Sequence, residues 1–449
     1  MKNDLLDLGS HIIQQAEKLG ATQSEVYLES SRILEVKMEK GHIKLASEKL
    51  DVGCGIRTIV GKQIGVSYIT SLLQGNLDQA VQDSIKAANA SVPDPDFSSL
   101  ASSDSAYPTV IGIFDKSLAQ LSCEEAVDMM TRGVQASYEV SGELRNMVEG
   151  DFTSKSITRV VVNSLGINEA SLETQAELTV YSAIGSGEDR CSSGDYQNTR
   201  TLREIDPEKI GMSSAQKALR LRGAKSIASG DMPLILTPSA LRAVLGFGFA
   251  EALDARQVQD GESYLVDSIG SEIASTELEI VDNALLPGAI GSRPFDAEGT
   301  PSQNTPLIVS GVLRNYLHDS YSSSKTGVKN TSNAFRSSYR VIPRIKASNL
   351  IVRPGTTTLD DMISEMTEGV LCVDTFDRPN MVTGELSAMI MEGFLIKKGE
   401  VKHALKSTLF GITMQDLLKR ATMIGSDVES RGSVLSPSIL IDSVKITSG

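Results

Sequence analysis

Two series of β-rich runs, each followed by a helical stretch, constrain the fold of this chain most strongly. The first series occupies residues 25–73, where glycines such as Gly41 and Gly61 separate runs of β-branched and other apolar residues. Runs divided by turn residues in this way are typical of antiparallel strands that follow one another along the chain. The pattern predicts strands at Val26–Leu28, Ile33–Met38, Ile43–Ala46, Gly53–Val60 and Gln63–Ile69, and in the second series at Leu144–Phe152, Ser156–Asn163 and Ala170–Ser182.

Helical stretches accompany both series. Ser122 and Glu125 have the spacing of a capping box, which should start a helix. Strands followed by a helix occur twice before residue 225, so an internal duplication stays open. We expect one N-terminal α+β domain over residues 1–225. Apolar residues at helical spacing predict its helices at residues 4–19, 76–90, 122–139 and 206–222.

The remaining residues, 226–449, predict a second α+β domain with a mixed β-sheet and a long buried helix. Gly223–Asp231 separates the two domains, because a new strand begins directly after it. The apolar stretch that follows contains Pro238 and Arg242, so we expect a buried helix over residues 238–256 rather than a membrane span. Helices and strands without regular alternation favour the α+β class.

Charge and cysteine content exclude several classes of function. Lys and Arg number 43, and Asp and Glu number 57, which gives a formal net charge of −14. An acidic chain without basic runs is not expected to bind phosphate backbones, so we expect no direct nucleic-acid partner. The four cysteines are scattered, and the N-terminus is acidic where a signal peptide would be basic. We therefore expect a cytoplasmic protein with no membrane partner.

The stretch Phe295–Arg353 suggests a groove for an extended ligand. It begins with the acidic turn Phe295-Asp-Ala-Glu-Gly-Thr-Pro301 and continues with two short strands around Ser310-Gly311. Tyr321–Ser338 is crowded with small polar residues, so we expect a mobile loop there. Leu350-Ile351-Val352 is then expected to form an exposed strand.

Five motifs in this half follow one another in a specific order and spacing. They are Phe295-Asp-Ala-Glu-Gly-Thr-Pro301, Leu307-Ile-Val-Ser-Gly-Val-Leu313, Arg353-Pro-Gly355, Gly384-Glu-Leu-Ser387 and Glu392-Gly-Phe-Leu-Ile396. Together they resemble the signature of the TldD/PmbA family, once called modulators of DNA gyrase. The N-terminal half resembles the family only in its layout. The resemblance implies a metallopeptidase family, whose active members hold zinc through His-Glu-x-x-x-His on the helix matching residues 238–256 and a Cys near the C-terminus.

This sequence lacks those zinc ligands. Its four histidines are His11, His42, His318 and His403, and no cysteine follows Cys372. A zinc peptidase needs imidazole or thiolate ligands and a glutamate that activates the bound water. The resemblance therefore implies a PmbA/TldE-type member with no catalytic residue, metal ligand or cofactor of its own.

Other residues leave chemical alternatives open. His318-Asp319 with Asp296 and Glu298 could gather a divalent metal, although carboxylates that hold a turn beside a solvated histidine are commoner. Glu251 and Asp254 could form an acid pair, although such residues usually give a buried helix its polar edge. Ser387 lacks both a G-x-S-x-G turn and an assignable histidine base, so we do not expect a serine nucleophile.

We therefore expect a metal-free subunit of a TldD/TldE-like complex that processes unfolded peptides. A TldD-like homologue carrying His-Glu-x-x-x-His would be the partner and would supply the zinc. A peptide would add as a strand near residues 305–316 or 339–352. The alternative is a self-contained homodimeric peptide-binding or assembly protein without proteolytic activity. Candidate substrate-binding residues are Asp296, Glu298, Thr300, Lys325, Lys329 and Asn330.

Overall fold

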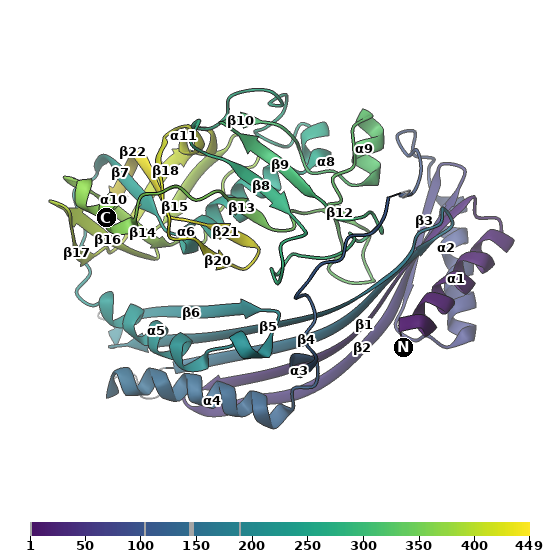
Figure 1. The fold of residues 1–449 in the computed structure, drawn as a ribbon, viewed down its shortest axis with the longest axis horizontal. Helices are drawn as coiled ribbons and strands as arrows, with labels where there is room; N and C mark the ends of the chain where they lie inside the picture. The colour runs from purple at the N-terminus through teal and green to yellow at the C-terminus, as the bar shows by residue number, and fades with distance from the viewer. Residues whose placement is uncertain (1, 103–104, 143–147, 188–189) are drawn as a thin grey trace.

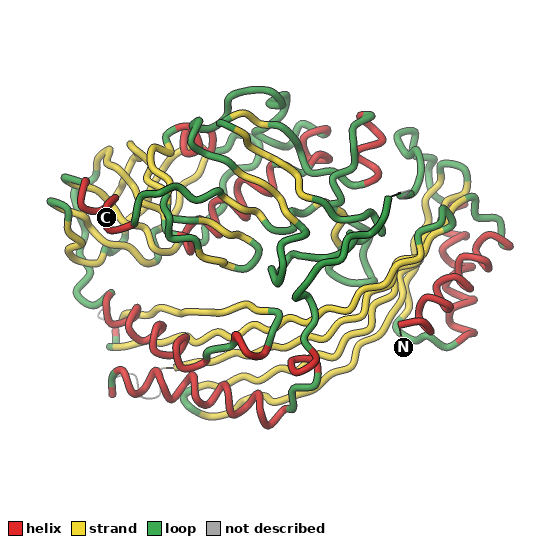
Figure 2. Tube along the Cα trace, viewed as in Figure 1, coloured by secondary structure: helices red, strands yellow, loops and turns green. Residues whose placement is uncertain are grey.

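A long curved sheet from the N-terminal half runs along one side of the molecule, and the C-terminal half lies against its inner face (Figure 1). The computed structural model describes residues 2–102, 105–142, 148–187 and 190–449. Helices cover the outer face of the sheet, and Figure 2 shows how sheet and helices separate into layers. The α+β class expected from the sequence is confirmed.

The curved sheet is antiparallel, with the strand order β3-β2-β1-β4-β5-β6. Its strands are β1 (Gln23–Glu39), β2 (His42–Val60), β3 (Gln63–Ile69), β4 (Val148–Asn163), β5 (Asn168–Ile184) and β6 (Cys191–Thr199).

The strands are longer than the sequence predicted. The stretches expected as separate strands at residues 26–28 and 33–38 both belong to β1. The polar residues between them stay in the strand, because β1 pairs with β2 on one side and β4 on the other, and Glu29 meets Arg159 of β4 at 3.4 Å. Residues 144–147 of the strand predicted at 144–152 lie outside the described residues.

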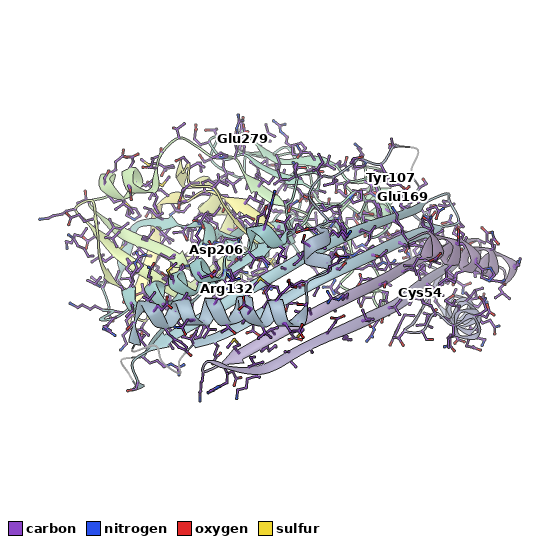
Figure 3. All side chains as sticks on the ribbon, turned by 60° about the horizontal axis from the view of Figure 1, so that its bottom comes forward. Cys54, Tyr107, Arg132, Glu169, Asp206 and Glu279 are labelled. Atoms are coloured by element: carbon purple, nitrogen blue, oxygen red, sulfur yellow. The ribbon has the colours of Figure 1, made fainter. Side chains whose placement is uncertain are left out.

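Side chains of β1 alternate between the two faces of the sheet. Val26 and Leu28 pack against α1 (Lys2–Lys18) and α2 (Gln74–Ala90), and Leu34 packs against α4 (Cys123–Val140). A fourth helix, α5 (Pro207–Arg220), packs on β5 and β6. Figure 3 shows this helical side, with Arg132 of α4 and Asp206, the N-cap of α5, labelled. The capping box predicted at Ser122 is confirmed, because Ser122 and Glu125 bond each other's backbone N–H at 3.2 and 2.8 Å.

The order helix, three strands, helix occurs twice in this half. The first set is α1-β1-β2-β3-α2 and the second is α4-β4-β5-β6-α5, and the two sets join through the antiparallel pair β1–β4. The connecting segments contain the short α3 (Lys116–Ala119) and η3 (Leu202–Glu204).

Three sheets make up the C-terminal half. The largest has the order β15-β18-β22-β7-β14-β16-β17, with β19 also paired to β22, and contains β7 (Gly230–Leu236), β14 (Glu368–Asp374), β15 (Glu385–Met389), β16 (Glu392–Lys397), β17 (Glu400–Ala404), β18 (Thr408–Thr413), β19 (Ala421–Ile424) and β22 (Ile439–Ser448). The second has the order β10-β9-β8-β13-β21-β20 and contains β8 (Ile280–Asn283), β9 (Asn304–Val309), β10 (Val312–Leu313), β13 (Leu350–Val352), β20 (Glu429–Arg431) and β21 (Val434–Ser436). The third pairs β11 (Ala334–Phe335) with β12 (Arg344–Ile345). Parallel pairs β14–β7 and β13–β21 confirm a mixed arrangement.

The main core of this half lies between its two large sheets and includes the apolar helix after β7. No helix among the described residues is long and apolar enough to cross a bilayer. The helices are α6 (Pro238–Ala243), the π-helical turn η4 (Val244–Phe249), α7 (Ala250–Ala252), α8 (Ala255–Gln259), α9 (Ser320–Thr326), α10 (Leu359–Glu365) and α11 (Met414–Lys419).

Two glycines of β2 allow the halves to meet. Sequence analysis placed Gly53 at the start of a strand, but both Gly53 and Gly55 lie inside β2. A Cβ on Gly53 would lie 2.1 Å from the ring of Tyr339, and a Cβ on Gly55 would lie 2.2 Å from the Tyr339 carbonyl oxygen. Tyr339 itself is buried with Tyr27 and Phe295 between the halves. Glycine is therefore required here by close approach rather than by a turn.

Two expectations for Phe295–Arg353 are wrong. Tyr321–Ser338 contains α9 and β11, and its small polar side chains are ordered by internal hydrogen bonds, such as the Asp319–Ser322 capping box that starts α9. Leu350–Val352 is not an exposed strand, because β13 lies between β8 and β21 in the second sheet. Periodicity in a short segment does not reveal which strands will flank it.

Candidate functional site

The helix expected over residues 238–256 is interrupted. It starts as α6 with Pro238 in its first turn, widens into the π-helical turn η4, and ends as α7 and α8. Gly246 and Gly248 lie in η4, where added Cβ atoms would be 3.1 Å from Val434 and 3.2 Å from Met414. Neighbouring side chains therefore approach this turn closely, and the small size of these glycines allows that packing. Single π turns inside helices are frequent at functional sites.

A pocket of about 540 Å³ lies beside this interrupted helix. One wall comes from the helix, a second from the segment around β12, and a third from the turn between β20 and β21. The helix and the turn at residues 431–434 are far apart in sequence, yet they meet here. The charged lining residues are Arg242, Glu251, Asp254, Arg344, Lys346, Arg378 and Arg431.

Positive charge dominates this cationic pocket, which we define by those seven residues. Arg378 lies 3.4 Å from Glu251, and Arg431 pairs with Asp195 at 3.0 Å and Glu429 at 2.8 Å. The other three cations form no ion pair with any described residue. They are Arg242, Arg344 and Lys346.

Aromatic rings hold two of these unpaired cations. The guanidinium of Arg242 lies 5.3 Å from the ring centroid of Phe376, 5.6 Å from Tyr196 and 5.7 Å from Phe247. The ammonium of Lys346 lies 4.7 Å from the centroid of Phe335. Stacking of this kind positions a cation without neutralising it.

The environment of Lys346 reflects the excess positive charge. Its side chain is exposed and lines the pocket, with the ammonium group over the ring of Phe335. Partial desolvation of the ammonium group and the charges of Arg293 and Arg344 lower the pKa of Lys346, although the charge of Glu251 acts in the opposite direction. A negative group entering the pocket would relieve that repulsion.

The carboxylate of Asp254 is already used by the fold. It caps α8 by accepting from the backbone N–H of Arg256 at 2.9 Å. Burial, with a contribution from nearby Asp319, raises the pKa of Asp254 to about 6. Glu251 and Asp254 therefore do not act as an acid pair. Asp254 caps a helix, and Glu251 pairs with Arg378.

Asp296 and Glu298 lie in the interior rather than on an open surface. Asp296 Oδ1 accepts from the backbone N–H groups of Glu298 and Thr300, each at 2.9 Å, so it shapes the turn as expected. Burial and the neighbouring charge of Glu298 raise the pKa of Asp296. Burial alone would also raise the pKa of Glu298, but Arg57 and the N–H of Ser320 hold it below its usual value.

An ion-pair network ties Glu298 to the curved sheet. Arg57 of β2 pairs with Glu298 at 3.0 Å and with Glu25 of β1 at 2.7 Å, and Glu25 also pairs with Arg336. The side chains of Glu25 and Glu298 are fully buried and that of Arg57 is 9% exposed. This interdomain network, formed by Glu25, Arg57, Glu298 and Arg336, therefore joins the two halves.

Two of the four remaining predicted residues lie at a different and larger pocket of about 1000 Å³, whereas Thr300 and Asn330 do not line it. Lys325 and Lys329 line it, and Lys325 also pairs with Asp96 at 3.0 Å. The Asn330 amide lies 3.4 Å from the hydroxyl of Thr300. None of the six predicted residues lines the cationic pocket. Their contact with a substrate stays a prediction.

The chain is similar to known proteins both in its sequence and in its structure. The model of the PmbA/TldA metallopeptidase C-terminal domain matches residues 229–448, and that of domain 1 matches residues 24–88, together more than half of the chain. The chain belongs to the TldD/PmbA family. The Haemophilus influenzae metalloprotease PmbA homologue is 25% identical over 99% of this chain and 96% of its own length.

Crystal structures show that the TldD/PmbA fold extends over the whole chain. A proposed modulator of a DNA gyrase from Thermotoga maritima matches with a TM-score of 0.89 at 21% identity, covering 98% of this chain and 99% of the other. TldE from Thermococcus kodakarensis matches with a TM-score of 0.88 at 22% identity, covering 98% and 100%. At this identity the structural likeness establishes the fold alone.

The cationic pocket does not fit the metal that the name of the TldD/PmbA family implies. Zinc is held by imidazole, thiolate and carboxylate groups, whereas this lining has five cations and two carboxylates that are already engaged. Over residues 2–102, 105–142, 148–187 and 190–449, no three His, Cys, Asp or Glu residues are grouped to hold a metal. His318 Nδ1 instead lies 3.2 Å from Ser322 Oγ, and burial lowers the pKa of His318.

Sequence reasoning missed the cations of this pocket. Arg242 was noted only as evidence against a membrane span, and the other four come from three separate segments. No local pattern connects these positions. One available signal was that the helix and the C-terminal tail, both associated with metal ligands by resemblance, should meet in space.

Proposed function

We propose that this chain is a metal-free, PmbA/TldE-type subunit that works with a TldD-like zinc peptidase on unfolded peptides. One observation carries the proposal: the pocket bounded by the helix and tail segments associated with metal ligands is lined by five cations. Like charges in a partly desolvated pocket repel a divalent cation strongly. The chain is thus suited to a role that requires no metal of its own, and zinc and the activated water would come from the partner.

Strand addition is the means by which this subunit would hold an extended peptide. The two regions expected to offer a strand edge are not equally suitable. On β9, Pro306 has no N–H, its carbonyl accepts from Asn315 at 2.8 Å, and the Leu307 carbonyl accepts from the Arg314 N–H at 2.8 Å. The β12 strand pairs only with β11 among the described residues and borders the cationic pocket. We therefore favour β12 as the holding edge.

Reconstitution tests this proposal. The purified chain, a TldD-like homologue from the same organism that carries His-Glu-x-x-x-His, and their mixture are each incubated with fluorescent unfolded casein. We expect the mixture to cleave casein and the chain alone to leave it intact. In the control, the partner carries Gln in place of the motif Glu, and cleavage should disappear although complex formation persists.

Two results would contradict the proposed role. Casein cleavage by the chain alone, abolished by a chelator and restored by zinc, would show that it is itself the peptidase. Recovery of the chain only as a homodimer, with no effect on the homologue's cleavage rate, would instead favour the self-contained binding or assembly protein. Size-exclusion chromatography with light scattering measures the assembly, and elemental analysis measures bound zinc.

A further inference from the structure

Three cations that form no ion pair with a described residue line one pocket beside a strand edge. Arg344 belongs to β12, Lys346 follows it, and Arg242 faces them from the interrupted helix. The remaining two cations of the pocket are neutralised by carboxylates, Arg378 by Glu251 and Arg431 by Asp195. The cations without an ion pair are therefore concentrated where β12 ends.

The hydrogen-bonding groups of these cations remain available. Arg242 stacks on three aromatic rings and Lys346 lies over one, and neither side chain donates a hydrogen bond to another described residue. A ring attracts a cation through its face, so the in-plane N–H groups of a guanidinium stay free for oxygen acceptors. Arginine forks match the geometry of a carboxylate or a phosphate.

Most of the uncharged lining is apolar, and Gln257 and Ser433 are its polar side chains. The apolar residues are Phe247, Ala250, Phe335, Ile345, Ala347, Leu350 and Val434. Free phosphate has no apolar group to pack against these residues. An acidic side chain in the middle of a peptide would likewise leave the apolar lining uncovered. An apolar residue that itself carries a carboxylate satisfies both parts of the pocket.

We infer that the cationic pocket binds the C-terminal carboxylate of an extended peptide whose last residue is apolar. The peptide backbone would run along β12, its terminal side chain would pack on Phe247 and Phe335, and its carboxylate would meet Arg242, Arg344 and Lys346. Capture of a terminal carboxylate by preplaced donors is an established mode of peptide recognition. The inference rests on the proposed function only in its choice of a peptide as ligand.

Binding of matched peptides tests the inference with the purified chain. The probe is fluorescein-Ala-Ala-Ala-Leu as the free acid, compared by fluorescence anisotropy with the same peptide as its C-terminal amide. We expect the acid to bind at least about tenfold more tightly, because the amide loses the charge-assisted hydrogen bonds. Arg344→Gln should remove about tenfold of the acid's affinity and leave the amide's unchanged.

The matched control is Arg353→Gln. Arg353 is 73% exposed, pairs with Glu279 at 2.7 Å, and does not line the cationic pocket. The Arg353→Gln variant should bind the free-acid peptide with the affinity of the unsubstituted chain. The Arg242→Gln variant should lose affinity for the free acid as Arg344→Gln does. Because Arg344 is exposed and forms no ion pair with a described residue, its variant should keep the far-UV circular dichroism spectrum of the parent.

Each remaining outcome overturns the inference. The inference is wrong if the acid and the amide bind with equal affinity, or if neither binds detectably. It is also wrong if Arg242→Gln and Arg344→Gln both leave the affinity for the acid unchanged. Competition by inorganic phosphate together with equal acid and amide affinities would identify a phosphate site instead. None of these results bears on partner-dependent casein cleavage, so a failure here is distinguishable from a failure of the proposed function.

Discussion

Replacement of Arg57 by Met should destabilise the chain severely, because it removes the central cation of the interdomain network. Glu25 would keep its pair with Arg336, but Glu298 would lose its ion pair and keep its hydrogen bonding with Ser320, whose backbone N–H donates at 2.9 Å. Breaking a buried ion pair by removing one partner costs about 3–5 kcal/mol, since the other charge stays buried without compensation. We expect a loss of this size in the free energy of unfolding at pH 7.

The pH dependence of this loss has a definite sign. In the parent chain the pKa of Glu298 is lowered, so its contribution to stability is present above the unfolded-state pKa and is lost as pH falls. In the Arg57→Met variant, burial without a cation should raise the pKa of Glu298, so stability is lost as pH rises through that pKa. The difference between the two chains should therefore shrink between pH 7 and pH 5.

Urea denaturation followed by far-UV circular dichroism measures the loss, since the chain has no Trp. The matched control is Arg132→Ala, because Arg132 pairs with Glu208 at 2.8 Å while 48% exposed (Figure 3). Such surface pairs contribute about 0–1 kcal/mol. Adding Glu298→Gln to Arg57→Met should recover part of the stability, because it removes the uncompensated charge. A loss no larger than that of Arg132→Ala would refute the argument.

Three further substitutions test separate parts of the structure. Gly55→Ala should lower the urea midpoint, since its Cβ would meet the Tyr339 backbone, whereas Gly75→Ala, with nothing within 4 Å, should leave the midpoint unchanged or raise it. Asp254→Asn should stabilise the chain by about 1–3 kcal/mol at pH 8 and have little effect at pH 4. The pKa of Asp254 is raised to about 6, so the Asp254 side chain stabilises the fold below its unfolded-state pKa, and that stabilisation is lost as pH rises through 6. Asn cannot ionise but can still cap the helix. An equal effect of the substitution at pH 4 and pH 8 would contradict this. Ser122→Ala should cost about 1 kcal/mol through the lost capping box of α4, and thermal melts that coincide with the parent would show that the cap is dispensable.

Features that depend on neighbouring residues in the chain were predictable. The capping box at Ser122 forms as its spacing indicated. Ser310 and Gly311 have φ of 49° and 77°, as a tight hairpin between two short strands requires. Family motifs are likewise read along the chain, and the TldD/PmbA membership that they implied is confirmed. Each of these features involves groups a few residues apart, so local sequence is sufficient to specify it.

Features that join distant segments were decided only by the tertiary structure. The polar stretch after His318 is ordered because its hydroxyls and amides find partners, and β13 is central because β8 and β21 flank it. Arg57 meets Glu298 across 241 residues. The cationic pocket gathers Arg242, Arg344 and Arg431 from three elements. A charge or a hydroxyl carries no local sign of the partner that will pair with it, since burial and pairing are created by folding itself.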